Sequence, residues 1–220
     1  MAMSPKTIQE LVQFRAGTVQ IEGNLVIPEG AHGIVLFAHG TGSSRMSPRN
    51  RFVAQELNDT GLATLLIDLL TREEEAVDAQ TAELRFDIDL LAGRLEGAID
   101  WLAANPPTSN LSIGLFGAST GAGAALVAAT HRTEQVKAIV SRGGRPDLAG
   151  PAISSVKAPV LLIVGGRDLP VVRLNKMVVD ELMVDNEVKV ISGATHLFEE
   201  PGALEEVARA AASWFTRYLR

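Results

Sequence analysis

Six short apolar runs, rich in β-branched residues, recur along the chain between residues 34 and 191. They cover residues 34–38, 63–69, 112–116, 136–141, 160–164 and 187–191. Polar and apolar residues do not alternate in these runs as they do in a strand with one face in water, so we expect strands that are buried on both faces. Such strands are typical of a parallel sheet.

An earlier segment has a different pattern. Residues 18–27 have the composition of two short strands around the dipeptide Gly23-Asn24. Glycine and asparagine together are a common turn signal, so this segment predicts a hairpin. Residues 1–17 are then an N-terminal extension that precedes the hairpin.

Two of the stretches between the apolar runs have helical periodicity. The apolar side chains on one helical face are Ile88, Leu91, Leu95, Ile99 and Leu102 in the first stretch, and Leu204, Val207, Ala208, Ala211 and Phe215 in the second. The alternation of strands with helices predicts an α/β fold with a doubly wound sheet. The acidic stretch 72–78 is typical of a solvated loop or of the start of a helix.

Length and composition fit one domain over residues 1–220, because 46% of the residues are hydrophobic and can form a substantial core. The net charge of −6 argues against a nucleic-acid partner, which needs a basic surface. The first ten residues lack the apolar core of a secretion signal, and no run approaches the roughly 20 apolar residues of a membrane span. We therefore expect a soluble, cytoplasmic protein without a membrane partner.

The chain has no cysteine, and its four histidines are scattered. Disulfides, a thiol nucleophile and thiolate metal ligands are therefore excluded. No histidine spacing of the H-E-x-x-H type indicates a metal. We expect neither a metal nor a cofactor.

Ser119 lies in the pentapeptide Gly117-Ala-Ser-Thr-Gly121, between the apolar run 112–116 and a stretch of small residues, 122–129. A serine between glycines at a strand-to-helix turn is typical of a hydrolase nucleophile. The turn is sharp and the backbone strained, and glycine at the flanking positions removes side chains that would collide with the strand and the helix. The alternative is that Ser119 is an ordinary helix N-cap.

A serine hydroxyl needs a base to accept its proton and a third group to orient that base. Asp168 and His196 each follow an apolar run, at the strand ends where open α/β sheets bind ligands. The chain order Ser119, Asp168, His196 is the order of the α/β-hydrolase fold. Asp168 could instead cap the helix that follows it, and Asp147 and, less favourably, Asp68 are the rival acids.

Acyl transfer also needs N–H groups directed at the oxyanion. The backbone N–H of Thr120, directly after the serine, is the first candidate donor. The glycine-rich turn after the first buried run, His39-Gly-Thr-Gly42, resembles the His-Gly oxyanion motifs of esterases, and there we assign the N–H of Thr41, with Gly40 as the alternative. An ordinary glycine turn is the simpler interpretation, whereas neither phosphate-binding glycine motif occurs in the sequence.

The chain resembles the α/β-hydrolases, and specifically their dienelactone-hydrolase-related branch. The residues that carry the resemblance are 39–45 (HGTGSSR), 117–121 (GASTG), 165–168 (GGRD) and 193–198 (GATHLF). The similarity spans about residues 18–220. It implies a central sheet of about eight mostly parallel strands flanked by helices, with Ser119, Asp168 and His196 as the catalytic triad.

One feature departs from this family: true dienelactone hydrolases use a cysteine at the position of Ser119. This difference favours general ester hydrolysis over dienelactone as the substrate. Cap domains of the superfamily usually follow the strand after the nucleophile helix, where this chain has only residues 143–157, a length typical of a long loop. We expect an open site without a cap domain, which suits small or short-chain esters.

Five arginines lie near predicted strand ends: Arg45, Arg49, Arg51, Arg142 and Arg145. Arg45, Arg142 and Arg145 are candidates to bind a substrate carboxylate, and the alternative is that they pair with surface acids. The predicted function is cofactor-free hydrolysis of a small-molecule ester by a serine carboxylesterase. Lactonase, thioesterase or acyltransferase activity would use the same residues, a non-catalytic binding protein is the alternative of another class, and the sequence leaves a homodimer open.

Overall fold

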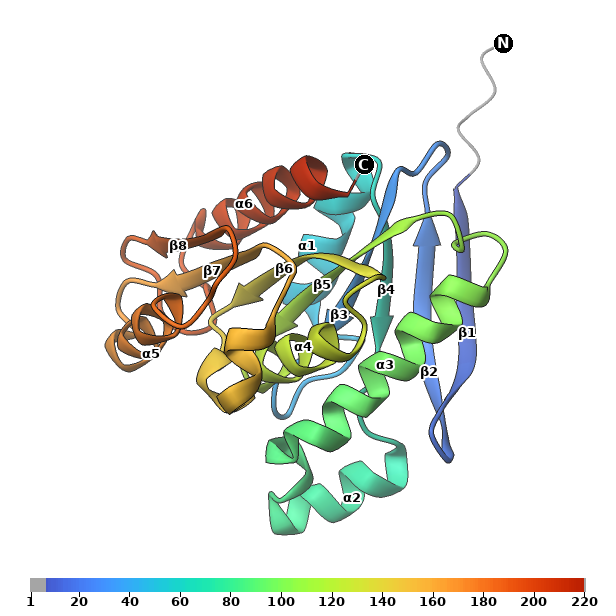
Figure 1. Ribbon diagram of the computed structural model, residues 1–220, viewed down its shortest axis with the longest axis horizontal. Coiled ribbons are helices and arrows are strands. Elements are labelled where there is room, and N and C mark those ends of the chain that lie inside the picture. Colours follow the sequence, from blue (N-terminus) through green and yellow to red (C-terminus); the bar gives the residue numbers. More distant parts are fainter. Residues whose placement is uncertain (1–6, 220) are drawn as a thin grey trace.

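The computed structural model describes residues 7–219 and contains an eight-stranded sheet with helices on both faces (Figure 1). The strands are β1 (Ile8–Ala16), β2 (Val19–Ile27), β3 (Gly33–Ala38), β4 (Ala63–Ile67), β5 (Ser112–Ala118), β6 (Val136–Arg142), β7 (Val160–Gly165) and β8 (Asn186–Ile191). Their order in the sheet is β1-β2-β4-β3-β5-β6-β7-β8. β2 runs antiparallel to both β1 and β4, and the other neighbouring pairs are parallel.

The prediction of a mostly parallel sheet of about eight strands flanked by helices is confirmed. All six predicted apolar runs form strands, but β8 is an edge strand in which only Ile191 is buried, so the prediction of burial on both faces was wrong for residues 187–191. Every residue of β3, β4 and β7 is buried. Burial on both faces explains why these strands are apolar throughout. Because β3, β5, β6, β7 and β8 are parallel, their carboxyl ends meet at one edge of the sheet.

Helices pack on both faces of the sheet. The helical elements are α1 (Pro48–Asp59), α2 (Arg72–Thr81), η1 (Leu84–Phe86), α3 (Ile88–Ala104), α4 (Thr120–His131), η2 (Pro146–Ser155), α5 (Leu169–Val179) and α6 (Ala203–Tyr218). α1 and α6 cover one face together, and α3, α4, η2 and α5 cover the other. Within residues 7–219, no helix has the length and apolar character needed to cross a membrane.

The hairpin lies elsewhere than the sequence pattern predicts. Residues 19–27 form one continuous strand, β2, and the turn is at Gly17 and Thr18, where Gly17 has φ +65°. Gly23 lies in the middle of β2. Glycine is needed there because a Cβ would lie 2.8 Å from Leu65 Cδ1 on the neighbouring β4. The prediction of a turn at Gly23-Asn24 was therefore wrong: this glycine marks a close approach between strands.

Part of the predicted N-terminal extension belongs to the sheet. Residues 8–16 form β1, which pairs with the whole length of β2. Phe14 and Ala16 are buried, and the Phe14 ring stacks on Trp101 of α3 with a centroid distance of 5.5 Å. β1 is thus an edge strand with one face in the core.

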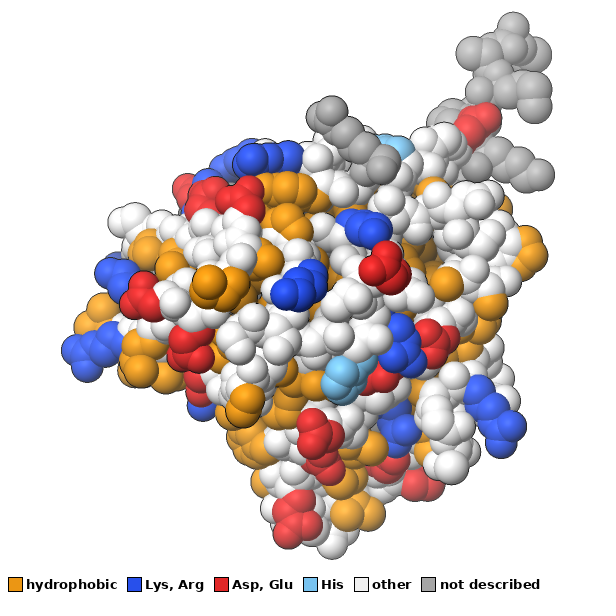
Figure 2. Space-filling model, viewed as in Figure 1, with side chains coloured by type: hydrophobic (Ala, Val, Ile, Leu, Met, Phe, Trp, Pro, Cys, Tyr) orange, Lys and Arg blue, Asp and Glu red, His pale blue; other side chains and the backbone are white. Residues whose placement is uncertain are grey.

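The acidic stretch 72–78 forms the start of helix α2, which was one of the two structures its sequence pattern favours. α2 and η1 project beyond the sheet, at the lower end of Figure 1. Acidic and hydrophobic side chains both face outward in this region (Figure 2), among them Glu73, Val77 and Phe86. The second expected loop, 143–157, contains the short helical segment η2, which bends at Gly150.

Candidate active site

Ser119 lies in a sharp turn between β5 and α4. Its backbone has φ 50° and ψ −122°, a conformation that residues other than glycine rarely adopt and that costs energy. Neighbouring backbone groups hold this conformation: the Ser119 N–H donates to the Arg142 carbonyl (3.3 Å), and the Ser119 carbonyl accepts from the N–H groups of Ala122 (3.1 Å) and Arg145 (2.9 Å). The turn is the strained strand-to-helix elbow that the pentapeptide predicts.

Both glycines of the pentapeptide are explained by close packing. A Cβ at Gly117 would lie 2.5 Å from the Cα of Ala122, and one at Gly121 would lie 2.4 Å from the carbonyl oxygen of Ala38. Real Cβ atoms do not approach backbone this closely, so any larger residue would push α4 away from β5 and β3. The glycines therefore hold the serine turn against the end of the sheet.

The Ser119 side chain does not act as a helix cap. Ser119 occupies the N-cap position of α4, yet its hydroxyl makes no capping hydrogen bond. Within residues 7–219 this hydroxyl has no hydrogen-bond partner at all, and the residue is partly exposed. It is therefore accessible to a substrate.

Asp168 and His196 lie side by side at the same edge of the sheet. The Asp168 carboxylate accepts a hydrogen bond from Nδ1 of His196, with a distance of 2.6 Å between Nδ1 and Oδ2. Because a carboxylate can only accept, this bond leaves the proton on Nδ1 and a free lone pair on Nε2. The side chain of Asp168 is 15% exposed and that of His196 is 38% exposed, so the histidine is the member of the pair that solvent and substrate reach.

The alternative roles of the acids are resolved by their partners. Asp168 is at the N-cap position of α5, but its side chain makes no capping bond. Asp147 pairs with Arg145 at 2.7 Å, and Asp68 accepts from the backbone N–H and the guanidinium of Arg45. Asp168 is thus the acid that contacts His196.

Ser119 and His196 both contact the end of β6, at Arg142 and at the residue after it. Arg142 accepts the Ser119 N–H through its carbonyl, and the next residue, Gly143, lies against the histidine: a Cβ at Gly143 would be 3.0 Å from the His196 carbonyl oxygen and 3.5 Å from Nδ1. No hydrogen bond joins the Ser119 hydroxyl to the imidazole in this structure. Such bonds are often long before a substrate binds and shorten in the complex.

The two candidate oxyanion donors are neighbours. The hydroxyl oxygens of Thr41 and Thr120 are 3.4 Å apart, so the loop after β3 and the first residue of α4 meet beside Ser119. The N–H of Thr120 belongs to the first turn of a helix, where backbone N–H groups have no acceptor within the helix. The N–H of Thr41 has no acceptor within residues 7–219.

His39 fixes the orientation of the Thr41 N–H. The Gly40 carbonyl accepts from Nδ1 of His39 (2.9 Å) and from the N–H of Ser43 (3.2 Å). The carbonyl and the N–H of one trans peptide point in opposite directions, so holding the Gly40 carbonyl turns the Thr41 N–H the other way. Nε2 of His39 accepts from the N–H of Leu69 (3.0 Å), which links the loop to the end of β4.

The hydrogen bonds of His39 fit a neutral imidazole, because its Nε2 accepts from the Leu69 N–H. It is buried, and this burial lowers its pKa, with the hydrogen bond to the Gly40 carbonyl as a smaller opposing effect. A neutral imidazole with its proton on Nδ1 satisfies both observed hydrogen bonds. The sequence motif suggested this loop, but the role of the histidine side chain depends on Leu69, which is 30 positions away in the chain.

The candidate substrate arginines have different environments. Arg45 pairs with Glu22 (2.6 Å) and Asp68, and Arg145 pairs with Asp147. Both therefore make the ion pairs that were the alternative to substrate binding.

Arg142 has no acidic partner among residues 7–219. Its guanidinium is buried and donates to the Asn50 side-chain oxygen at 3.4 Å, while Nε and Nη1 have no partner within the described chain. Burial, together with the nearby charge of Arg49, lowers the pKa of Arg142 to about 10. This side chain lies under α1 and does not line the cavity beside the serine.

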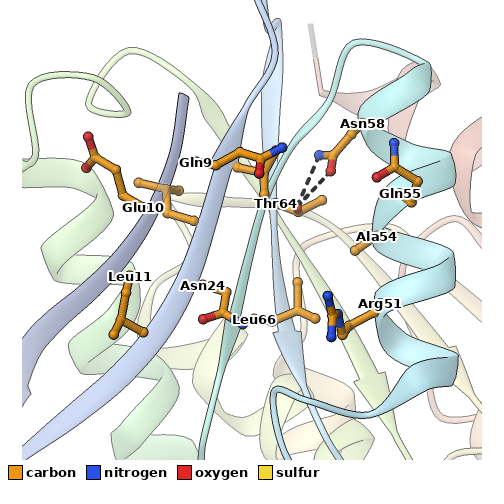
Figure 3. Close-up of a pocket in the computed structure, with 12 residues that line it drawn as sticks. Gln9, Glu10, Leu11, Asn24, Arg51, Ala54, Gln55, Asn58, Thr64 and Leu66 are labelled. Carbon is orange, nitrogen blue, oxygen red and sulfur yellow. Dashed lines mark hydrogen bonds between the residues drawn. The ribbon is translucent and has the colours of Figure 1, made fainter. Parts of the chain in front are cut away.

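Two cavities of similar size are present. One, of about 340 Å³, is lined by the loop after β3, Thr120 and residues of α2, and so adjoins the oxyanion donors. The other, of about 360 Å³, lies between α1 and strands β1, β2 and β4 (Figure 3), where the Asn58 side chain donates to Thr64. None of its lining residues belongs to the serine turn, to Asp168 or to His196, so we assign the chemistry to the slightly smaller cavity.

Among the described residues, no group of three or more histidine, aspartate or glutamate side chains is arranged to hold a metal ion. The site consists of a strained serine, an aspartate–histidine pair and backbone donors at the carboxyl edge of a mostly parallel sheet. This combination of fold and residues defines the class of α/β-hydrolases.

The chain belongs to the dienelactone hydrolase family, whose family model matches residues 21–220. A dienelactone hydrolase from Anabaena variabilis has 61% sequence identity, and its crystal structure superimposes with a TM-score of 0.95 over 98% of this chain and 99% of that one. A dienelactone hydrolase-like promiscuous phosphotriesterase from metagenomic libraries has the same fold with 21% identity and a TM-score of 0.79, over 97% of this chain and 99% of that one.

A curated relative from Mycobacterium tuberculosis is not named as a hydrolase. It is called "Putative phosphoribosyl transferase", and it is 55% identical to this chain over 218 residues, which are 99% of this chain and 48% of the relative. The chain thus spans about half the length of the curated relatives it matches. Their name describes proteins about twice as long, and it does not assign an activity to this half.

Proposed function

We propose that the chain is a cofactor-free serine hydrolase that cleaves carboxylic esters of small molecules through an acyl-enzyme on Ser119. The observation that carries the proposal is the 2.6 Å hydrogen bond between Asp168 and His196 at the sheet edge that also presents the unpartnered Ser119 hydroxyl. The membership in a hydrolase family supports it. Phosphoribosyl transfer, the activity in the name of the longer relatives, has no such support from the residues of this site.

The proposed reaction begins with a proton transfer. Nε2 of His196 accepts the proton of the Ser119 hydroxyl, whose oxygen attacks the acyl carbon of the ester. Asp168 keeps the imidazole in the tautomer with a free Nε2 and stabilises the imidazolium that forms. The N–H groups of Thr41 and Thr120 stabilise the negative charge on the carbonyl oxygen in the tetrahedral intermediate.

The second half of the reaction uses the same groups in reverse. The His196 imidazolium gives its proton to the leaving alkoxide, and the acyl group remains on Ser119. A water molecule then attacks the acyl carbon while Nε2 of His196 accepts its proton. Collapse of this second intermediate releases the carboxylic acid and returns the proton to Ser119. Lactones, thioesters and transfer to another alcohol require the same groups, so substrate panels must separate these activities.

The test is hydrolysis of p-nitrophenyl acetate by the wild-type chain and by Ser119→Ala and His196→Ala. Each variant should lower kcat/KM by at least about 10³-fold, because the residues act as a unit. Ser213→Ala, on the exposed side of α6 and absent from the cavity lining, is the matched control and should retain activity within a few fold. Equal turnover by wild type and Ser119→Ala would contradict the proposal, and folded wild type without turnover of any ester, thioester or lactone would favour a binding role.

A further inference from the structure

The 340 Å³ cavity beside the oxyanion donors has two walls of different origin. One wall is the loop after β3, from His39 to Ser44, together with Thr120. The other wall is formed by helix α2 and the segments that flank it; its lining residues are Leu69, Leu70, Glu75, Asp78, Ala79, Arg85 and Leu91. The sequence pattern gave no reason to connect the acidic stretch 72–78 with the site.

We propose that this cavity binds the acyl group of the substrate, and that α2 selects uncharged acyl groups larger than acetyl. The inference rests on the proposed esterase function. Thr120, one of the two proposed oxyanion donors, and Gly40, next to the other, line the cavity, whereas His196 and Asp168 do not. The leaving alcohol must lie next to His196, which protonates it. A cavity on the oxyanion side and away from the histidine is therefore left for the acyl group.

Helix α2 is a fixed wall. At its first turn, the Glu74 N–H donates to the Thr71 hydroxyl (3.2 Å) and the Thr71 N–H donates to the Glu74 carboxylate (2.8 Å), which is a complete capping box. The other oxygen of Glu74 pairs with Arg94 of α3 at 2.6 Å. Near the end of the helix, Asp78 accepts from the backbone and the guanidinium of Arg85. These bonds at both ends set the width of the cavity.

The size of the cavity sets the size of the acyl group. At about 30 Å³ for each water-sized group, 340 Å³ corresponds to roughly ten non-hydrogen atoms. Leu70, Leu91 and Ala79 supply apolar surface for a chain or ring of this size. Each additional methylene that is buried there strengthens binding, until the space is filled.

The charge of the lining argues for an uncharged acyl group. Asp78 and Arg85 neutralise each other by their ion pair of 2.7 Å. Glu75 lines the same cavity, and its side chain has no hydrogen-bond or ion-pair partner within residues 7–219. Its negative charge would repel an acyl group that ends in a carboxylate. The candidate carboxylate ligands Arg45 and Arg145 are already paired with acids.

The test is a comparison of acyl groups by variants of one helix. We measure kcat/KM for the p-nitrophenyl esters of acetate and hexanoate with wild type, Ala79→Trp and Ala76→Trp. Both alanines are exposed on α2, but only Ala79 lines the cavity. Wild type should prefer hexanoate at least tenfold. Ala79→Trp should lower the hexanoate-to-acetate ratio of kcat/KM at least tenfold, and Ala76→Trp should keep the wild-type ratio.

A second arm tests the charge. The p-nitrophenyl monoester of adipate has a hexanoate-sized acyl group that ends in a carboxylate, and wild type should hydrolyse it at least tenfold less efficiently than the hexanoate. Glu75→Gln should reduce this discrimination severalfold, and Glu73→Gln, exposed on α2 and absent from the cavity lining, should not. If Ala79→Trp does not fold, Ala79→Leu serves in its place and should give a smaller change in the same direction.

The outcomes separate the two proposals. Turnover of acetate with an unchanged hexanoate-to-acetate ratio in Ala79→Trp would overturn the acyl-cavity inference and leave the esterase intact. Unchanged discrimination against the adipate monoester in Glu75→Gln would overturn the charge selection. Absence of turnover of every ester by folded wild type would overturn the esterase function and, with it, this inference.

Discussion

The Asp168 carboxylate accepts a hydrogen bond from a histidine and does not cap the helix that follows it. At an N-cap position an aspartate normally accepts backbone N–H groups, yet this one accepts from Nδ1 of His196 at 2.6 Å. The bond determines which imidazole nitrogen is free to act as a base. We propose that Asp168 orients the imidazole and stabilises its positive charge, which a neutral amide would not do.

Asp168→Asn should lower kcat/KM for p-nitrophenyl acetate by about 10³- to 10⁴-fold, because an amide can donate to Nδ1 and favour the wrong tautomer. The unfolding midpoint should change little. Asp147→Asn is the matched control: Asp147 was the rival acid, and it contacts Arg145 instead of His196. Steady-state kinetics of both variants checks the assignment, and a larger loss in Asp147→Asn than in Asp168→Asn would contradict it.

Two buried arginines differ in their partners. Arg94 pairs with Glu74 at 2.6 Å and donates to the Ala16 carbonyl, whereas Arg142 has one long hydrogen bond to Asn50 and no acid. A buried charge is costly unless it is paired, and the lowered pKa of Arg142 has the same cause. The sequence indicated that arginines gather near strand ends, but which of them pair with acids depends on contacts between distant elements.

Arg142→Met should raise the free energy of unfolding by about 1 kcal/mol, because it removes an unpaired buried charge and keeps an apolar stem. Arg94→Met should lower it by about 2 kcal/mol, because Glu74 is left without its partner. Urea denaturation at pH 7.5 measures both. If Arg142→Met loses as much stability as Arg94→Met, the Arg142 guanidinium is not an unpaired buried charge.

The loop after β3 is the element that joins the site to the rest of the fold. Its buried histidine, His39, bonds to the Gly40 carbonyl and to the N–H of Leu69 beyond β4. Burial holds the pKa of His39 below its value of about 6.5 in an unfolded chain. Between these two pKa values the unfolded chain binds a proton that the folded chain does not, so the folded state loses stability as the pH falls through about 6.5.

His39→Gln tests this linkage. The variant should be less stable at pH 7.5, but between pH 7.5 and 5.5 it should lose about 1 kcal/mol less than wild type does. His131→Gln is the control, because His131 is exposed and pairs with Glu96 at 2.8 Å. The readout is the free energy of unfolding in urea at a series of pH values. An identical dependence on pH in wild type and His39→Gln would rule out a neutral buried His39.

Elements with an uninterrupted apolar pattern were predictable, and elements with an ambiguous local signal were not. The six strands β3 to β8 and the helices α3 and α6 follow from the apolar pattern alone, although β8 is an edge strand and is not buried. The dipeptide Gly23-Asn24 has the local signal of a turn, but the packing of Leu65 against Gly23 requires a continuous strand. Tertiary packing outweighed local turn preference at that position.

At the scale of the whole molecule, the sequence predicted the sheet and the sheet edge at which the candidate catalytic residues lie. The glycine-flanked Ser119, Asp168 and His196 each follow a strand of the parallel part of the sheet, and parallel strands bring their carboxyl ends together. The wall formed by α2 could not be predicted, because the acidic residues of its outward side dominate its composition. The role of β1 was also missed, since polar and apolar positions alternate only over residues 12–16 and the pattern breaks at residues 8–11.

The edge strand β1 is part of the cooperative fold. Phe14 is 3% exposed and stacks on Trp101 of α3, whereas Leu11, on the other face of the same strand, is 64% exposed. Phe14→Ala should lower the free energy of unfolding by about 3 kcal/mol, and Leu11→Ala by less than about 0.5 kcal/mol. Urea denaturation followed by tryptophan fluorescence compares them. Equal small effects would mean that β1 does not contribute to the core.

The proposed function requires that Ser119 is an activated nucleophile. The most direct measurement is reaction of the folded chain with a fluorophosphonate probe, followed by mass spectrometry of the intact protein and of its peptides. One adduct is expected, on Ser119, which is absent from Ser119→Ala and forms far more slowly in His196→Ala. An adduct on another residue, or no adduct on a folded chain with an accessible Ser119, would contradict it.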